Sequence, residues 1–115
     1  MDNKNIVWLE KDMFMKNLVV FDGFSVDYIE ILPGAIEESV VHTQCDEWIY
    51  VLEGQLLFNL NDSVFLLKTG EFVNIPRNTI HGSVNESKDN VKLLSVCNPP
   101  FELDFMTKVK KQNDA

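Results

Sequence analysis

The sequence has few cysteines and no long apolar run, and each shortage excludes a class of protein. Its two cysteines among 115 residues, Cys45 and Cys97, are too few for a disulfide scaffold. In a small domain without a secretion signal we expect both to be free thiols. No run approaches the ~18 apolar residues of a membrane-spanning helix, and the polar residues 1–5 lack the apolar core of a signal peptide. The sequence therefore predicts a cytoplasmic protein with no membrane partner.

Basic residues are also scarce. Lysine and arginine total 10 against 18 acidic residues, which gives a formal net charge of −8. The one basic run, at 108–111, is short and terminal, whereas nucleic-acid binding needs a basic face. We therefore expect no nucleic-acid partner. The length, the hydrophobic content of 45% and the charged content of 24% are typical of one globular domain, spanning 1–115.

Short β-prone segments separated by turns fill most of the chain. Residues 24–31 alternate apolar and polar side chains, as a half-buried strand does, and Asn61-Asp62 reads as the turn of a hairpin. Other predicted strands lie at 6–9, 18–21, 39–44, 47–52, 56–60, 63–67, 72–75, 80–85 and 91–97. Residues 101–106 alternate as well, either as an extra edge strand or as an arm packed on a partner subunit. The pattern predicts an all-β fold, a sandwich or barrel such as a double-sheet jelly roll.

Both histidines fall in one stretch, residues 42–85, and its spacing resembles the two motifs of the cupin family. Glu47 and Gly54 keep the six-residue gap of the first motif. Four residues match the second motif at every spacing: Gly70, Pro76, His81 and Asn85. The resemblance covers about residues 34–99 and implies a double-stranded β-helix, or jelly-roll barrel. Strands within 6–32 would precede this core, and a C-terminal arm, 100–115, would follow it.

The resemblance also implies a metal site at the open end of the barrel. By position, its ligands would be His42, Gln44, Glu47 and His81, with Gln44 in place of a second histidine and a loop one residue short. His42 and Gln44 are two residues apart, so on a strand they would share a face. A competing register aligns Val41 and Thr43 with the two histidines of the motif and leaves only Glu47 and His81. Imidazole and carboxylate ligands suit a divalent transition metal, namely Fe, Mn, Ni, Zn or Cu.

Residues near the predicted ligands have alternative interpretations. Cys45 is a thiolate that favours a softer metal, a redox-sensitive thiol at the cavity mouth, or a thiol without a role. Arg77, the only arginine, is either an anchor for a substrate carboxylate or phosphate or a solvated turn residue. Five aromatic residues either line an apolar pocket or fill the core: Trp48, Tyr50, Phe58, Phe65 and Phe72. Cys97 ends an apolar run and reads as a buried residue.

Three functions fit these features, because a fold does not specify function. The first is a metal site that acts on a small oxygenated molecule, as a dioxygenase, isomerase or cyclase would; Glu47 could instead serve as a free base. The second is a binding module without turnover whose metal site is degenerate or empty. The third is a mainly structural role, in which barrels form a homodimer by strand addition. The expected partners are a small molecule and a second copy of the chain.

Overall fold

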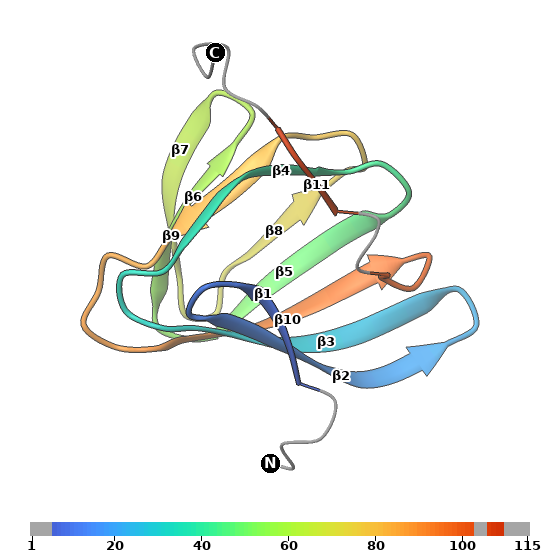
Figure 1. Ribbon diagram of the computed structural model, residues 1–115, viewed down its shortest axis with the longest axis horizontal. Helices are drawn as coiled ribbons and strands as arrows, with labels where there is room; N and C mark the ends of the chain where they lie inside the picture. Colours follow the sequence, from blue (N-terminus) through green and yellow to red (C-terminus); the bar gives the residue numbers. More distant parts are fainter. Residues whose placement is uncertain (1–5, 103–105, 110–115) are drawn as a thin grey trace.

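A computed structural model of the protein describes residues 6–102 and 106–109, and these form strands without any helix (Figure 1). The strands are β1 (Ile6–Glu10), β2 (Met13–Phe21), β3 (Phe24–Ile31), β4 (Ile36–His42), β5 (Asp46–Glu53), β6 (Gln55–Leu60), β7 (Ser63–Lys68), β8 (Phe72–Ile75), β9 (His81–Val84), β10 (Val91–Asn98) and β11 (Met106–Lys108). Within the described ranges, therefore, no helix is long and apolar enough to cross a membrane.

The strands form two antiparallel sheets that face each other (Figure 1). The larger sheet has the order β1-β2-β3-β10-β5-β8, and the smaller has the order β11-β4-β9-β6-β7. Neighbours in space are often distant in sequence, as in a jelly roll: β10 lies between β3 and β5, and β9 lies between β4 and β6. The predicted all-β jelly-roll class is confirmed.

Alternation along the strands fixes which side chains enter the space between the sheets. Along β3 and β10, buried residues alternate with partly exposed ones, as the two-residue period of a strand requires. The buried side chains of both sheets form one hydrophobic core: Met13, Met15, Ile29, Ile31, Ala35, Ile49, Val51, Leu56, Phe58, Leu67, Ile75, Val91 and Leu93. Several of these core residues, among them Met13, Ile29 and Phe58, also line an interior cavity.

The turns form largely where the sequence predicts them. Asn61, the first residue of the predicted hairpin turn, has a φ of 51°, a left-handed conformation that asparagine tolerates. The adjoining strands β6 and β7 pair from Leu60↔Ser63 onward. The predicted strand at 18–21 is part of the longer β2, whose pairing with β3 shifts register between Asn17 and Val19. This irregularity interrupts the apolar alternation, so the sequence shows only the second half of the strand.

The C-terminal segment is an edge strand of its own chain. β11 pairs antiparallel with β4, with Met106 opposite His42 and Lys108 opposite Val40. Before it, the backbone N–H of Phe101 donates a hydrogen bond to Ser25 Oγ, 2.9 Å away. Of the predicted arm, residues 103–105 and 110–115 lie outside the described residues. Of the segment for which the two alternatives were considered, 101–106, only Met106 lies in β11, and Phe101 and Glu102 are in no strand.

Candidate metal centre

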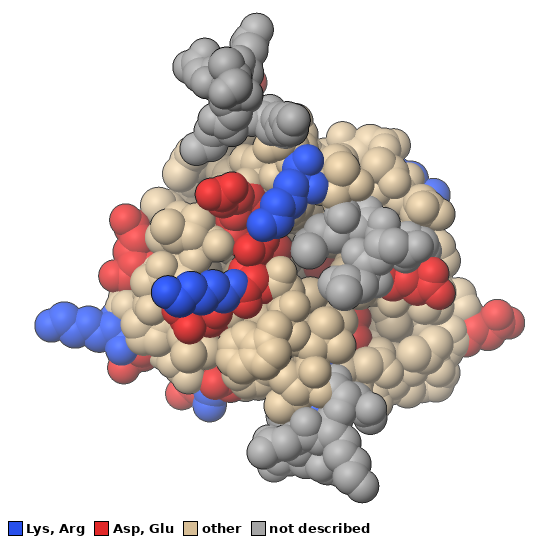
Figure 2. Space-filling view, viewed as in Figure 1, with Lys and Arg blue, Asp and Glu red and all other residues tan. Residues whose placement is uncertain are grey.

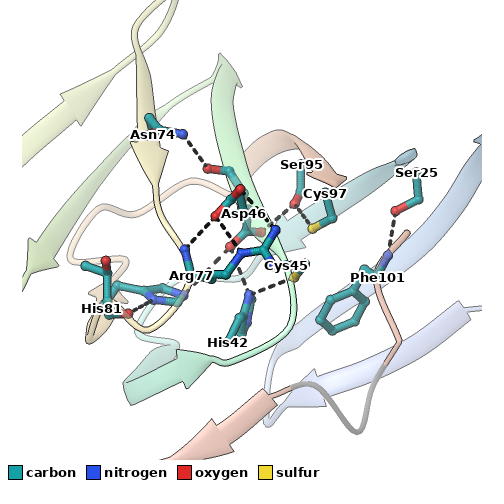
Figure 3. Close-up of polar contacts among 12 residues, drawn as sticks. Ser25, His42, Cys45, Asp46, Asn74, Arg77, His81, Ser95, Cys97 and Phe101 are labelled. Atoms are coloured by element: carbon teal, nitrogen blue, oxygen red, sulfur yellow. Dashed lines mark hydrogen bonds and ion pairs between the residues drawn. The ribbon is translucent and has the colours of Figure 1, made fainter. Parts of the chain in front are cut away.

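His42 is the last residue of β4, and its side chain is buried against the interior. In the pairing of β4 with β9, Val40 lies opposite His81, so His42 is the diagonal neighbour of His81. The two imidazole rings meet edge to face with their centroids 4.9 Å apart (Figure 3). The Nε2 atom of His42 is buried and has no hydrogen-bond partner in the described protein. A buried polar atom without a partner is unfavourable, and a bound ligand or water would supply the missing contact.

His81 is the first residue of β9 and follows the turn that begins at Pro76. Asn78, which replaces a glycine of the cupin motif, holds a φ of 66° in this turn. The His81 Nδ1 atom lies 3.0 Å from the backbone oxygen of Thr79. This contact assigns the ring proton to Nδ1, which donates to that oxygen and leaves Nε2 free to bind a metal.

Glu47 connects the two histidines from the opposite sheet. Its Oε1 atom lies 3.5 Å from His42 Nδ1 and 3.7 Å from His81 Nε2. Its Oε2 atom accepts a hydrogen bond from Ser95 Oγ at 2.5 Å. One ligand atom from each of the three residues lies within 4.8 Å of the others, and all three residues are buried. Ligands bound to one ion at about 2.1 Å lie roughly 3.0 to 3.4 Å apart, so small side-chain adjustments would bring this set around a metal.

Burial and the neighbouring carboxylate act in opposite directions on the two histidines. Burial lowers the pKa of His81 and outweighs the charge of Glu47, so His81 is neutral at pH 7, as a metal ligand must be. Burial also acts to lower the pKa of His42. There, the contact with Cys45 and the charge of Glu47 together prevail, and the pKa of His42 is raised. A metal cation bound in place of the His42 proton would likewise be stabilised by the negative charge of Glu47.

Gln44 does not join this group. β4 ends at His42, and Thr43 and Gln44 form a bend with both side chains exposed. The expectation that His42 and Gln44 share a face fails because two-residue alternation holds only within a strand. The competing register is not found either, since it would turn His42 outward, whereas His42 is buried.

Cys45 occupies the inward position after the bend. It is fully buried, and its Sγ lies 3.8 Å from His42 Nδ1 (Figure 3). A hydrogen bond with Cys97 and the contact with His42 lower the pKa of Cys45 to about 6. Both cysteines are free thiols, as predicted, and Cys97 is buried. Cys45 thus lies beside the His42–Glu47–His81 group within the protein, not exposed at its mouth.

Arg77 lies outside the cavity. Its backbone N–H donates to Asp46 Oδ1 at 2.8 Å, and its guanidinium contacts both carboxylate oxygens of Asp46 at 3.2 and 3.3 Å (Figure 3). Both side chains are substantially exposed. The position of Arg77 therefore does not support a role as a substrate anchor. Its contacts with Asp46 connect the turn after Pro76 to the start of β5.

A cavity between the sheets opens next to the three candidate ligands. Its lining combines apolar and polar side chains: Leu9, Met13, Met15, Asp27, Ile29, Ile31, Glu37, His42, Glu47, Ile49, Leu56, Phe58, His81, Ser83, Leu93, Ser95 and Phe101. About 30 Å³ inside it is accessible to water, enough for about two water molecules.

The aromatic residues divide between the two faces of the sheets. Of the five that the sequence analysis considers, Phe58 lines the cavity. Trp48, Tyr50 and Phe72 are exposed on the outer face of the larger sheet, where Tyr50 pairs with Phe72 across β5 and β8. Phe101, which the sequence analysis did not assign to the site, lines the cavity and lies 5.5 Å from the His42 ring.

Four polar residues of the cavity were also missed: Asp27, Glu37, Ser83 and Ser95. A signal for Asp27 is present in the sequence, because the β3 residues alternate as Phe-Ser-Val-Asp-Tyr-Ile-Glu-Ile. The structure turns Ser25 and Asp27 inward and leaves Val26 and Tyr28 on the outer side, only partly buried. Polar residues at alternate positions of a central strand therefore mark a site.

Comparison with solved structures identifies the same architecture in other proteins. The structure of KdgF from Halomonas sp. matches with a TM-score of 0.77 at 20% identity, over 84% of this chain and 87% of that one. An RmlC-like cupin from Shewanella frigidimarina matches with a TM-score of 0.76 at 21% identity, over 90% and 89%. A Thermus thermophilus protein matches with a TM-score of 0.73 at 26% identity, over 88% and 97%. No curated protein gave a significant match.

The family assignment comes from the sequence itself. The family model described as "Cupin domain" matches residues 27–97, which is more than half of the chain. The matched range runs from Asp27 in β3 to Cys97 in β10 and includes all three candidate ligands. The chain belongs to the cupin family.

Proposed function

We propose that this cupin binds one divalent transition metal through His42, Glu47 and His81 and holds a small oxygenated molecule beside it. The observation that supports this proposal is the convergence of three buried ligand atoms within 4.8 Å of one another. Imidazole and carboxylate ligands suit Fe, Mn, Ni, Zn or Cu. When bound, such an ion supplies Lewis acidity to the oxygen of a ligand.

The surrounding residues prepare the three side chains for this role. The backbone oxygen of Thr79 orients the His81 ring, and Ser95 fixes the Glu47 carboxylate by donating to its second oxygen. Such outer contacts typically raise metal affinity 10- to 100-fold. All three candidate ligands are buried, and the lower dielectric constant of the interior strengthens electrostatic interactions at the site.

Binding without turnover is the alternative function. The departure from the first motif favours it, because Gln44 stands in place of a histidine and its side chain is exposed. In this alternative the metal site is degenerate or empty, and the barrel holds a small ligand without turnover.

Metal analysis tests the proposal directly. Protein purified without an affinity tag should contain close to one equivalent of a first-row transition metal, or take it up from added Fe, Mn, Ni or Zn. Elemental analysis after gel filtration measures this content. The proposal would be overturned if the purified protein contained no metal and took up none of the four added ions.

A substitution at Gln44 tests the ligand set. Because its side chain is exposed in the bend after β4, Gln44→Ala should leave metal content and affinity unchanged within about twofold, well below the 10- to 100-fold effect of losing even an outer-shell contact. Titration against a competing chelator measures the affinity. A loss of tenfold or more would restore Gln44 as a ligand.

A further inference from the structure

The cavity contains three carboxyl groups from three strands. Glu47 on β5 belongs to the proposed metal site, and Asp27 on β3 and Glu37 on β4 also line the space. In the part of the chain that the structure describes, no lysine or arginine is among the lining residues. Among the described lining residues, the basic side chains are therefore His42 and His81, the two proposed imidazole ligands.

Asp27 is held beside the metal site by the sheet register. It lies opposite Ser95 in the pairing of β3 with β10, and Ser95 Oγ donates to Glu47. Asp27 is 2% exposed. Its Oδ1 atom accepts a hydrogen bond from Asn17 Nδ2 at 2.8 Å. One carboxylate oxygen is thus fixed by β2, and the residue borders the cavity next to Ser95.

Burial of a carboxylate is unfavourable unless charge or hydrogen bonds compensate for it. Burial raises the pKa of Asp27, and the charge of Glu47 raises it further, while the hydrogen bond from Asn17 offsets part of the rise. Burial likewise raises the pKa of Glu37 to about 8. Neither residue is needed to bind the proposed metal. Perturbed carboxyl groups that line a cavity are candidates for ligand binding.

We infer that the ligand of this cavity carries no negative charge and that its hydroxyl or amine hydrogens are bound by Asp27. An anion beside the metal would meet the repulsion of the Asp27 carboxylate, whereas a hydroxyl or amine would donate a hydrogen bond to it. The net charge of −8 also disfavours the approach of anions to the protein surface. Figure 2 shows acidic side chains at several places on the face in view. This inference rests on the proposed function, because it assigns the ligand class of that metal site.

The first experiment uses Co²⁺-loaded protein with azide as an anionic probe and imidazole as a neutral one, both followed by the visible Co²⁺ spectrum. Asp27→Asn keeps the shape of the side chain and removes its charge. Azide affinity should rise about tenfold in this variant, which corresponds to one favourable charge change of about 1.4 kcal/mol, and imidazole affinity should change by less than twofold. Asp62→Asn, in the exposed β6–β7 turn, changes the net charge equally and should leave azide affinity unchanged.

The second experiment identifies the donor. Ethylene glycol and ethanolamine are titrated into the same Co²⁺ protein as competitors of azide, and at least one should bind about tenfold more weakly to Asp27→Asn than to the wild type. A larger loss for ethanolamine assigns an amine ligand, and a larger loss for ethylene glycol assigns a hydroxyl ligand.

The outcomes separate the two proposals. Failure of the wild type to bind Co²⁺ overturns the proposed function. Normal Co²⁺ binding with unchanged azide affinity in Asp27→Asn overturns the exclusion of anions. Equal affinity of the wild type and the variant for both competitors overturns the role of Asp27 as the binding group. Thermal unfolding of Asp27→Asn verifies that the variant is folded.

Discussion

Replacing Glu47 with glutamine should lower the affinity for divalent metal by more than about 100-fold, beyond the effect of losing an outer contact. Glu47 lies within 4 Å of both imidazole rings, and it is the one acidic residue among the three candidate ligands. Glutamine has the same shape and can still accept the hydrogen bond from Ser95, so the fold should persist. Competition with a chromophoric chelator measures the affinity for Zn²⁺ or Mn²⁺.

A matched control lies on the same strand. Glu53 is exposed at the end of β5 and pairs with Lys92 at 3.1 Å. Glu53→Gln makes the same change in charge and should leave metal affinity within about twofold, since surface ion pairs contribute little. If Glu47→Gln binds metal as tightly as the wild type, Glu47 is not a ligand, and a base in a metal-poor site becomes the better interpretation.

Replacing Asn85 with alanine should lower the free energy of unfolding by about 3 kcal/mol. Asn85 is fully buried. Its Nδ2 donates to the backbone oxygens of Ile31 and Asp89 at 3.0 and 2.8 Å. Its Oδ1 accepts hydrogen bonds from the N–H and the hydroxyl of Ser87 at 3.0 and 2.6 Å. Alanine would leave the Ile31 oxygen without this donor inside the protein. Urea denaturation measures the change.

Asn90 provides the control for this substitution. Its Nδ2 donates to Glu30 Oε2 at 2.8 Å, but the residue is exposed and water replaces the lost contact. Asn90→Ala should change the free energy of unfolding by less than about 0.5 kcal/mol. A small effect at Asn85 would mean that this motif residue does not stabilise the loop between β9 and β10.

The class of fold can be predicted from the sequence because turns and strand alternation are local properties. Which face of each strand points into the core cannot be predicted in the same way, because alternation alone does not say which set of residues is buried. In β3 the apolar residues Phe24, Val26 and Tyr28 face out, and Ser25 and Asp27 face in. Asp27 was therefore overlooked as a cavity residue.

The candidate site was predicted only in part for a similar reason. His81, Glu47 and His42 come together because the motif spacing reflects the pairing of β4 with β9 and the position of β5. Gln44 was placed with them by extending the strand through residue 44, but the bend at Thr43 ends the alternation two residues early. Arg77 was left open between a substrate anchor and a solvated turn residue because nothing local reveals that Asp46, 31 residues earlier, binds it.

The position of β10 determines when the cavity can exist during synthesis. β10 completes the larger sheet by pairing with β3 on one side and β5 on the other, and it carries Ser95, which holds Glu47. Until residue 98 has left the ribosome, β3 and β5 have no strand between them. His42, Glu47 and His81 are all synthesised earlier, yet Glu47 lacks its contacts with β10 until that point. A metal that needs all three side chains would therefore bind only after β10 has been synthesised.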